Sequence, residues 1–438
     1  MHSFHYDSGR LFCEDVDLSH VAKKHGTPVY VYSAGTILDH YRRLQLALGE
    51  IDHLICYAVK ANSNGAILRL FADEGAGFDV VSGGELFRVV RAGGDPTRCT
   101  FAGVGKSREE IEYALDQKVF SFNVESEAEL DCINDIARSK GVRAPIAVRV
   151  NPDVAAHTHK YISTGESENK FGIALDQIAD VYAKAASLPN ILVRGLQMHI
   201  GSQITDAAPF AEAIKKIAPV ALDLRRRYGI EFFSIGGGMG IVYESSFASG
   251  GRAWWTRDHN KVGDAPKQLT IDDYVAAILP RLRSLHGMRV LLEPGRFLVG
   301  NAGVLLTRVR YIKESAQKKF VIVDAGMNDL IRPALYQSFH EIVPVEKPAS
   351  SSSQERVDVV GPVCESADFF AQDRELPAMK QGDLAAIMSA GAYGFVMASN
   401  YNSRPLPAEV LVRAGNFSLI RDRQTNADLV RGEIEPAW

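Results

Sequence analysis

The chain has 438 residues, of which 46% are hydrophobic and 23% charged, and its formal net charge is −4. This length suffices for two domains with a large core, while the near-neutral charge excludes a protein built around a basic surface for nucleic acid or anionic lipid. No apolar run reaches the ~18 residues of a membrane helix. The first ten residues, MHSFHYDSGR, lack the charged and apolar regions of a signal peptide. We therefore expect a cytoplasmic protein with no nucleic-acid or membrane partner.

The cysteines and histidines form no disulfide or metal pattern. Five cysteines stand far apart without a CxxC pair, namely Cys13, Cys56, Cys99, Cys132 and Cys364. We expect neither a disulfide framework nor a zinc site from them. His157 and His159, in HTHK, have no further residues at ligand spacing nearby, so we expect no metal there either.

Residues 1–35 contain two strand-like pieces, FHYD and PVYVYS, on either side of a helical patch at Val21–His25. From about residue 36 to residue 296, apolar strand-like runs alternate with helix-like segments. The eight runs are HLICYAVK, FDVV, CTFAGV, VFSFNV, APIAVRVN, VRGLQMHI, FFSIGGG and MRVLLEP. This alternation predicts a (β/α)8 barrel closed by right-handed crossovers, with an open doubly wound sheet as the alternative.

Two helix starts support the alternation. Ser82 with Glu85, and Ser126 with Glu129, have the spacing of a capping box, in which serine and glutamate satisfy backbone N–H groups reciprocally. We therefore expect these two glutamates to have a structural role first.

Beyond residue 300 the pattern changes to strands with few helical stretches: VLLTRVRYI, KFVIVDAG, VDVVGP, DLAAIMSAG, AEVLV and FSLIRD. They predict a separate domain resembling a β-sandwich or β-barrel, which the strand-rich N-terminal segment completes. The predicted domains are thus a barrel at 36–296 and a β domain from 1–35 and 297–438. Residues 244–267, expected at the catalytic face, and 348–355 are predicted loops.

One lysine ends an apolar strand. In CYAVKANSN, residues 56–64, Lys60 follows a run that is apolar on both faces, as in a parallel strand covered on both sides. Such a lysine is either a rim residue that reaches water or a desolvated amine that acts as a nucleophile and forms a Schiff base.

Two glycine-rich segments are similar to nucleotide-binding motifs, but neither has a glycine at every position that its motif requires. In GGGMG, residues 236–240, the third glycine of a dinucleotide motif would fall at Ile241. These glycines can instead turn N–H groups toward one phosphate, or form a tight turn that needs positive φ. GVGKS, residues 103–107, ends like a P-loop, but Thr100 stands where its first glycine belongs.

Seven motifs between residues 57 and 394 carry a resemblance to a known family: YAVKAN, MHIGSQI, GGGMG, EPGRF, DAGMNDLIRPALY, GPVCESADFF and GAYG. Together they resemble the alanine racemase-like, fold type III decarboxylases, which include the diaminopimelate, ornithine and arginine decarboxylases. They look most like the diaminopimelate decarboxylases. The resemblance implies an enzyme with pyridoxal 5′-phosphate as its cofactor.

The resemblance also implies roles for barrel residues. Lys60 would bind the cofactor as a Schiff base, His199 would stack on its ring, and Asp79 would support the site. Glu293 would face the pyridine nitrogen and strengthen the ring as an electron sink; a rim glutamate paired with Arg296 is the alternative. The remaining implied cofactor contacts are Gly236, Gly237, Gly238, Pro294, Gly295 and Arg296, of which Arg296 could equally contact the substrate.

In the β domain, the resemblance implies that Cys364 of the CES motif is a catalytic proton donor. Tyr393 of GAYG would contact cofactor or substrate. Arg332, Tyr336 and Glu365 are the implied substrate contacts. One position departs from the family, because Asn169 precedes Lys170 where we expect serine, and its role stays open.

The distal end of the substrate separates the members of the family. Diaminopimelate ends in an ammonium and a carboxylate, which need an acid and a base together, whereas ornithine and arginine end in a cation only. Arg332 with Tyr336, and Glu365, supply both kinds of partner, since an arginine fork suits a carboxylate. This favours conversion of meso-2,6-diaminopimelate to L-lysine and carbon dioxide over decarboxylation of another dibasic amino acid or of carboxynorspermidine.

Two other protein classes are alternatives. A racemase of this fold presents arginine to the pyridine nitrogen, where Glu293 is expected here. A non-catalytic pyridoxal-phosphate carrier lacks the β domain, which takes about 140 residues of this chain. The resemblance further implies a homodimer in which the β domain of one subunit completes the active site of its neighbour.

Overall fold

The computed structural model of the protein describes residues 1–154, 170–251, 254, 269–348 and 353–438. The chain divides into two compact units. One unit consists of Leu38–Ile241 and His259–Leu298, and the other of Met1–Ile37, Val242–Asp258 and Val299–Trp438. Most of the predicted loop 244–267, and residues 349–352 of the predicted loop 348–355, lie outside the described residues.

The first of these units is a closed barrel of eight parallel strands in the described part of the chain. The strands are β5 (His53–Ala58), β6 (Gly77–Val80), β7 (Cys99–Phe101), β8 (Ser121–Val124), β9 (Ala144–Asn151), β11 (Ile191–Met198), β12 (Phe232–Ser234) and β13 (Arg289–Leu292). They pair in the order β9-β11-β12-β13-β5-β6-β7-β8, and β8 pairs again with β9. Each strand overlaps one predicted run, although β6 and β11 begin one and two residues before theirs, so the (β/α)8 barrel is confirmed and the open sheet is excluded.

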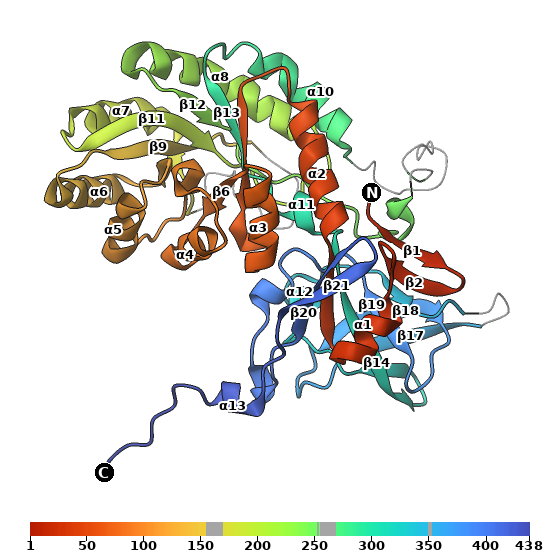
Figure 1. The fold of residues 1–438 in the computed structure, drawn as a ribbon. Helices are drawn as coiled ribbons and strands as arrows, with labels where there is room; N and C mark the ends of the chain where they lie inside the picture. Colours follow the sequence, from red (N-terminus) through yellow and green to blue (C-terminus); the bar gives the residue numbers. More distant parts are fainter. Residues whose placement is uncertain (155–169, 252–253, 255–268, 349–352) are drawn as a thin grey trace. The chain divides into compact units, whose positions relative to one another are not determined.

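Helices lie outside the ring of strands (Figure 1). They are α2 (Ala34–Ala47), α3 (Gly65–Asp73), α4 (Gly83–Arg91), α5 (Arg108–Asp116), α6 (Glu127–Lys140), α7 (Ile178–Ser187), α8 (Ala208–Tyr228) and α10 (Ile271–Leu282). Because side chains fill the inside and helices cover the outside, the strands are apolar on both faces. An inner cluster joins four of the strands: Leu54, Cys56, Ala147, Phe232 and Leu291.

The predicted capping boxes form only in part. Ser82 accepts from the N–H of Glu85, but the Glu85 carboxylate accepts from Val81, one residue before the cap. Ser126 and Glu129 repeat this arrangement. Each glutamate thereby ties the strand end to the helix that follows, which is the structural role expected of it.

The rejected P-loop lysine also has a structural role. Lys106 is buried, and its ammonium donates to the carbonyl oxygens of Gly103 and Asn123 and to the Glu129 carboxylate. These contacts join the loop after β7 to strand β8 and to helix α6. They satisfy a buried charge that would otherwise be costly.

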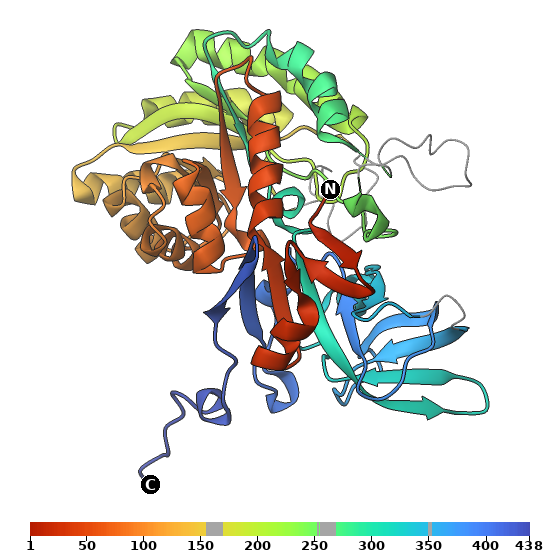
Figure 2. The ribbon, with the colours of Figure 1, turned by 45° about the vertical axis from the view of Figure 1, so that its right-hand side comes forward.

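The other unit is built on a mixed sheet of order β18-β17-β15-β14-β4-β20-β21. Its strands are β4 (Val29–Ser33), β14 (Gly303–Glu314), β15 (Lys319–Val323), β17 (Gln354–Val360), β18 (Phe369–Pro377), β20 (Ala408–Arg413) and β21 (Asn416–Arg421), with β16 (Ile342–Pro344) and β19 (Leu384–Ile387) beside β14. Strand β4 pairs with both β14 and β20, so the N-terminal segment does complete the β domain (Figure 2). The short helix α12 (Arg332–Tyr336) lies between β15 and β16, and α13 (Asn426–Leu429) follows the last strand, β21.

The FHYD piece does not join that sheet. It forms β1 (Phe4–Asp7), which pairs with β2 (Arg10–Cys13), and β3 (Val16–Asp17) completes a separate three-stranded sheet before α1 (Leu18–His25). Ser8 and Gly9 link β1 to β2 with φ of 48° and 80°. Positive φ at both residues matches the right-handed twist of a two-residue hairpin, so β1 finds its partner locally.

Candidate functional site

Lys60 lies just beyond the carboxyl end of β5. The strand ends at Ala58, and Val59–Ala61 form a 3-10 turn that carries the lysine. Its ammonium donates to the Asp79 carboxylate of β6 at 2.9 Å. Asp79 is buried, whereas the Lys60 side chain is 40% exposed. The residue therefore presents its ammonium at the barrel rim, where a buried carboxylate holds it.

The EPGRF turn packs directly against the turn of Lys60. The Ala58 N–H donates to the Pro294 carbonyl oxygen at 3.0 Å. A side chain on Gly295 would contact the Cβ atoms of Ala58 and Ala61 at 3.1 and 3.0 Å, so glycine permits this close approach. Arg296, at the start of α11 (Arg296–Val299), is buried and donates to the Ser202 hydroxyl at 3.1 Å.

Glu293 immediately follows β13 and is buried inside the barrel unit. The Ser234 hydroxyl donates to one carboxylate oxygen at 2.7 Å, and the Gln197 amide donates to the other at 3.0 Å. Burial, together with the negative charge of Asp79, raises the pKa of Glu293 to about 7. A cation placed against this carboxylate would lower its pKa and favour the charged form.

The glycine run after β12 lies against neighbouring backbone. A methyl group on Gly236, Gly237 or Gly238 would overlap the carbonyl oxygen of Met198, Glu293 or Gly201, respectively. Gly236 and Gly238 have φ of 73° and 110°, in the region that glycine alone adopts readily. The run is therefore required to be glycine, and it lies at the end of the barrel that carries Lys60. Its Gly236 N–H donates to the Ser234 hydroxyl at 3.3 Å.

His199 follows β11 and connects the glycine run to the barrel interior. The Gly237 N–H donates to its Nδ1 at 3.2 Å, which assigns the ring proton to Nε2. Desolvation, followed by the positive charges of Arg149 and Lys60, holds the pKa of His199 well below its usual range. The imidazole is therefore neutral at physiological pH, a state suited to stacking on an aromatic ring.

A buried ion pair near His199 was not foreseen. Arg149, on β9, donates to both carboxylate oxygens of Glu125 at 3.1 Å, and both residues are buried. Glu125 also accepts from the backbone N–H of Gly103 and Gly172. Arg149 contributes to the lowered pKa of His199, and the pair joins three loops of the barrel unit.

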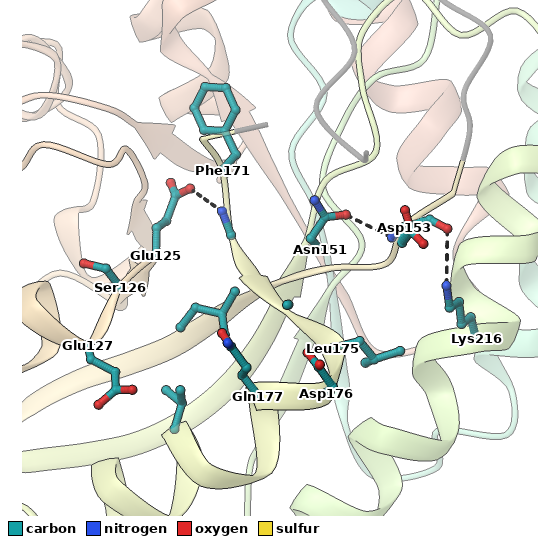
Figure 3. A pocket seen from close by; sticks show the side chains of 14 residues that line it. Glu125, Ser126, Glu127, Asn151, Asp153, Phe171, Leu175, Asp176, Gln177 and Lys216 are labelled. Carbon is teal, nitrogen blue, oxygen red and sulfur yellow. Dashed lines mark hydrogen bonds between the residues drawn. The ribbon is translucent and has the colours of Figure 1, made fainter. Parts of the chain in front are cut away.

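A pocket of about 830 Å³ is lined in part by Glu125, the carboxylate of this ion pair. Figure 3 shows the side chains around it. Its lining includes Glu125, the end of β9, the short strand β10 (Ile173–Ala174) that pairs with β9, and Lys216 of α8. Lys216 donates to the Asp153 carbonyl oxygen at 3.2 Å. The predicted cofactor residues are absent from the described lining. His157, His159 and Asn169 lie outside the described residues.

The CES loop of the other unit is exposed and anchored by residues that sequence reasoning missed. The Cys364 N–H donates to the Asn402 side-chain oxygen at 2.8 Å. The Tyr401 hydroxyl donates to the Glu365 carboxylate. Asn402 has φ of 55°, a left-handed conformation that asparagine tolerates better than most residues. The Cys364 thiol and the Glu365 carboxylate therefore lie at the surface of their unit.

The remaining predicted contacts lie in the same unit as the CES loop. Arg332, the first residue of α12, is buried, and Tyr336 ends that helix half-buried. Tyr393 has φ of 56°, a left-handed conformation that is strained for an aromatic residue. Gly391 and Gly394 flank it, and a side chain on either would overlap a carbonyl oxygen. Backbone strain of this kind is concentrated at functional sites.

A pyridoxal phosphate fits the barrel residues. Lys60, Glu293 and the glycine run follow β5, β13 and β12, and the carboxyl ends of parallel strands meet at one end of a barrel. Buried polar atoms also remain for a ligand or water: Gln197 Oε1 and both amide atoms of Asn123 have no hydrogen-bond partner among the described residues. Amine, carboxylate and backbone N–H groups match the aldehyde, ring nitrogen and phosphate of this cofactor.

Known proteins resemble this chain over its full length. The family model described as pyridoxal-dependent decarboxylase, pyridoxal binding domain, matches residues 34–300. The diaminopimelate decarboxylase of Pseudomonas aeruginosa is 48% identical over 436 residues, covering 99% of each chain. That of Vibrio cholerae is 46% identical over 432 residues, covering 98% of each.

Solved structures agree with the sequence comparisons. Diaminopimelate decarboxylase of Helicobacter pylori, complexed with L-lysine, has a TM-score of 0.86 at 40% identity, covering 95% of this chain and 98% of that one. The M. jannaschii enzyme in complex with L-lysine has a TM-score of 0.89 at 37% identity, covering 99% and 98%. None of the helices in the described ranges has the length and apolar composition to cross a membrane. The chain therefore belongs to the diaminopimelate decarboxylases, a family of pyridoxal-phosphate-dependent lyases.

Proposed function

We propose that this protein converts meso-2,6-diaminopimelate into L-lysine and carbon dioxide, the last step of lysine biosynthesis. The observation that carries the proposal is the buried carboxylate of Glu293, which Ser234 and Gln197 hold in the same barrel as Lys60. When bound, pyridoxal phosphate supplies an electron sink for the pair of electrons left by the departing carboxylate. A carboxylate at its ring nitrogen keeps that nitrogen protonated, which favours decarboxylation over racemisation.

The other residues of the barrel bind and orient the cofactor. Lys60 supplies the amine that attaches the cofactor, and Asp79 holds that amine in place. His199, in its neutral form, would stack on the ring, and the run Gly236–Gly238, in which glycine permits close approach, would lie against the phosphate. Cys364 donates a proton to the reacting carbon after carbon dioxide leaves.

The residues that bind the distal end of the substrate determine which amino acid the enzyme accepts. Arg332 and Tyr336 bind the distal carboxylate, and Glu365 binds the distal ammonium, with Arg296 and Tyr393 as further contacts. A buried arginine such as Arg332 suits this role, because a guanidinium fork binds a carboxylate through two parallel hydrogen bonds. The L-lysine bound in two related structures supports an amino-acid ligand of this kind.

We further propose that the protein acts in the cytoplasm as a homodimer. Cys364 and Glu365 belong to one compact unit and Lys60 to the other. In the proposed dimer, the CES loop of each subunit completes the site around Lys60 of its neighbour, and the two-fold axis makes both sites equivalent.

Carbon dioxide release tests the substrate. We expect the holoenzyme to release carbon dioxide from meso-2,6-diaminopimelate with a kcat/KM at least ~100-fold higher than from ornithine, arginine or L-lysine, because a site that binds polar substrate groups rejects analogues lacking them. The measurement is release from each amino acid at equal concentration. Preference for ornithine or arginine would contradict the proposal.

Replacing Arg332 with alanine should weaken diaminopimelate binding. A buried carboxylate that loses its arginine partner costs about 2–4 kcal/mol, so we expect KM to rise roughly 30-fold or more. Steady-state kinetics on the folded variant measure this change, with kcat falling less than KM rises. An unchanged KM would remove Arg332 from the substrate site.

A further inference from the structure

A buried histidine contacts the side chain of Arg332. His340 is 0% exposed, and its Nε2 lies 3.3 Å from Nε of Arg332. On the other side of the ring, Nδ1 lies 2.8 Å from the carbonyl oxygen of Met388. No sequence motif singles out this histidine, which follows LIRPALY by four residues.

The two contacts together fix the state of the His340 ring. A carbonyl oxygen can only accept, so Nδ1 carries the hydrogen that bonds to Met388. The Nε–H of an arginine can only donate, so Nε2 of His340 carries the lone pair that accepts it. Both contacts are satisfied only by the neutral Nδ1–H tautomer. A protonated ring would direct an N–H at the arginine and place two cations together.

Further residues hold the same arginine. Its Nη2 donates to the Ser338 hydroxyl at 3.2 Å. Its guanidinium carbon lies 5.1 Å from the centre of the Tyr243 ring, and that ring makes an edge contact with His340 at 5.2 Å. The guanidinium is therefore constrained both at its edge and on its face. Arginine loses much rotamer freedom when it binds a ligand, and these contacts remove that freedom beforehand.

We propose that His340 is a positioning residue for Arg332: as a neutral acceptor, it aims the guanidinium at the carboxylate that the ligand carries at its distal end. The inference rests on the proposed function, because it takes Arg332 as the carboxylate contact. It adds a residue that does not itself touch the substrate. A purely structural role is the competing account, in which the bond from Nδ1 to Met388 matters and the bond to Arg332 does not.

Two amide substitutions separate these accounts. In His340→Gln, the longer side chain places its amide oxygen near the position of Nε2, so it keeps an acceptor for Arg332. In His340→Asn, the shorter side chain places its amide nitrogen near Nδ1, so it keeps only the donor to Met388. His340→Phe retains the ring and loses both bonds. His25→Phe, in the same unit, is the matched control for a histidine-to-phenylalanine change.

The readout is binding rather than turnover. The holoenzyme is titrated calorimetrically with L-lysine and with 1,5-diaminopentane, which lacks the carboxylate. We expect His340→Phe and His340→Asn to weaken L-lysine binding by about 10-fold or more, the cost of losing a hydrogen bond to a charged group. We expect 1,5-diaminopentane binding to change by less than about 2-fold, because it engages no arginine fork. His340→Gln and His25→Phe should bind L-lysine within about 3-fold of wild type, since the acceptor is retained or untouched.

A double mutant completes the test. In an Arg332→Ala background, His340→Phe should weaken L-lysine binding no further, because residues that act as one unit are not additive. The positioning role would be overturned if His340→Phe weakened L-lysine binding equally with and without Arg332. It would also be overturned if His340→Asn, rather than His340→Gln, kept the wild-type affinity for L-lysine. If Arg332→Ala itself leaves the preference for L-lysine over the diamine unchanged, the assignment of Arg332 under the proposed function fails. If Arg332→Ala weakens L-lysine binding and the His340 variants leave it unchanged, the positioning role alone fails.

Discussion

Replacing Lys60 with alanine is expected to abolish decarboxylation, lowering kcat by about 10³-fold or more. The reason is chemical, because the Lys60 amine is the group that attaches the cofactor, and alanine leaves no nucleophile there. Borohydride reduction of the wild-type holoenzyme should trap the cofactor on Lys60, where peptide mapping locates it. In the Lys60→Ala protein the trapped cofactor should be absent from this peptide.

A second variant distinguishes the loss of the Lys60 amine from the loss of its positive charge. Lys60→Arg keeps a cation beside the buried Asp79 carboxylate but supplies no amine that attaches the cofactor. It should therefore stay folded, remain inactive and give no trapped product. Trapped cofactor on a different lysine in the wild-type protein, such as the buried Lys106, would remove Lys60 from its assigned role.

The barrel was predictable because its strands have an unambiguous pattern. Runs such as APIAVRVN are apolar on both faces, and their ends are marked by glycine, asparagine or a helix cap. The end of β5 was misjudged by two residues, since Val59 and Lys60 turn away into a 3-10 turn. Apolar residues alone do not mark where pairing with the neighbouring strand stops.

The groups around Glu293 were not predictable. Gln197 and Ser234 stand 96 and 59 residues before Glu293 in the chain, and neither belongs to EPGRF, the motif that contains Glu293. Their proximity follows from the barrel closing, which places the ends of β11, β12 and β13 side by side. The raised pKa of Glu293 depends on burial, and burial is a property of the closed fold.

The β domain was harder to predict from local pattern. Strand β18 was missed because its central residues, AQDRE, are mostly polar, as in a loop. It lies at the edge of the sheet, where outward charged residues prevent further pairing, and the β17–β18 register shifts twice. The bond between Arg332 and His340 was missed for a similar reason, since no periodicity records which side chain a buried arginine contacts.

Mixing two inactive variants is expected to restore activity if active sites are shared between subunits. Lys60→Ala removes the cofactor amine, and Cys364→Ala removes the proton donor while keeping the backbone bond to Asn402. After subunit exchange in equal amounts, about half of the dimers are mixed, by random pairing of two equivalent subunits. Each mixed dimer has one site with both residues intact and one with neither. Activity should therefore recover to roughly a quarter of wild type.

The arrangement within the dimer decides the outcome. If each chain builds its own site, every site in the mixture lacks either Lys60 or Cys364, and no activity returns. A mixture of Lys60→Ala with Glu293→Ala is the matched control, because both residues lie in one compact unit and must serve the same site. This second mixture should stay inactive in either arrangement. Tagged subunits verify exchange, and each single variant must be folded and inactive alone. Exchange without recovery in the first mixture would contradict the shared site, because complementary subunits would then have met without completing one another.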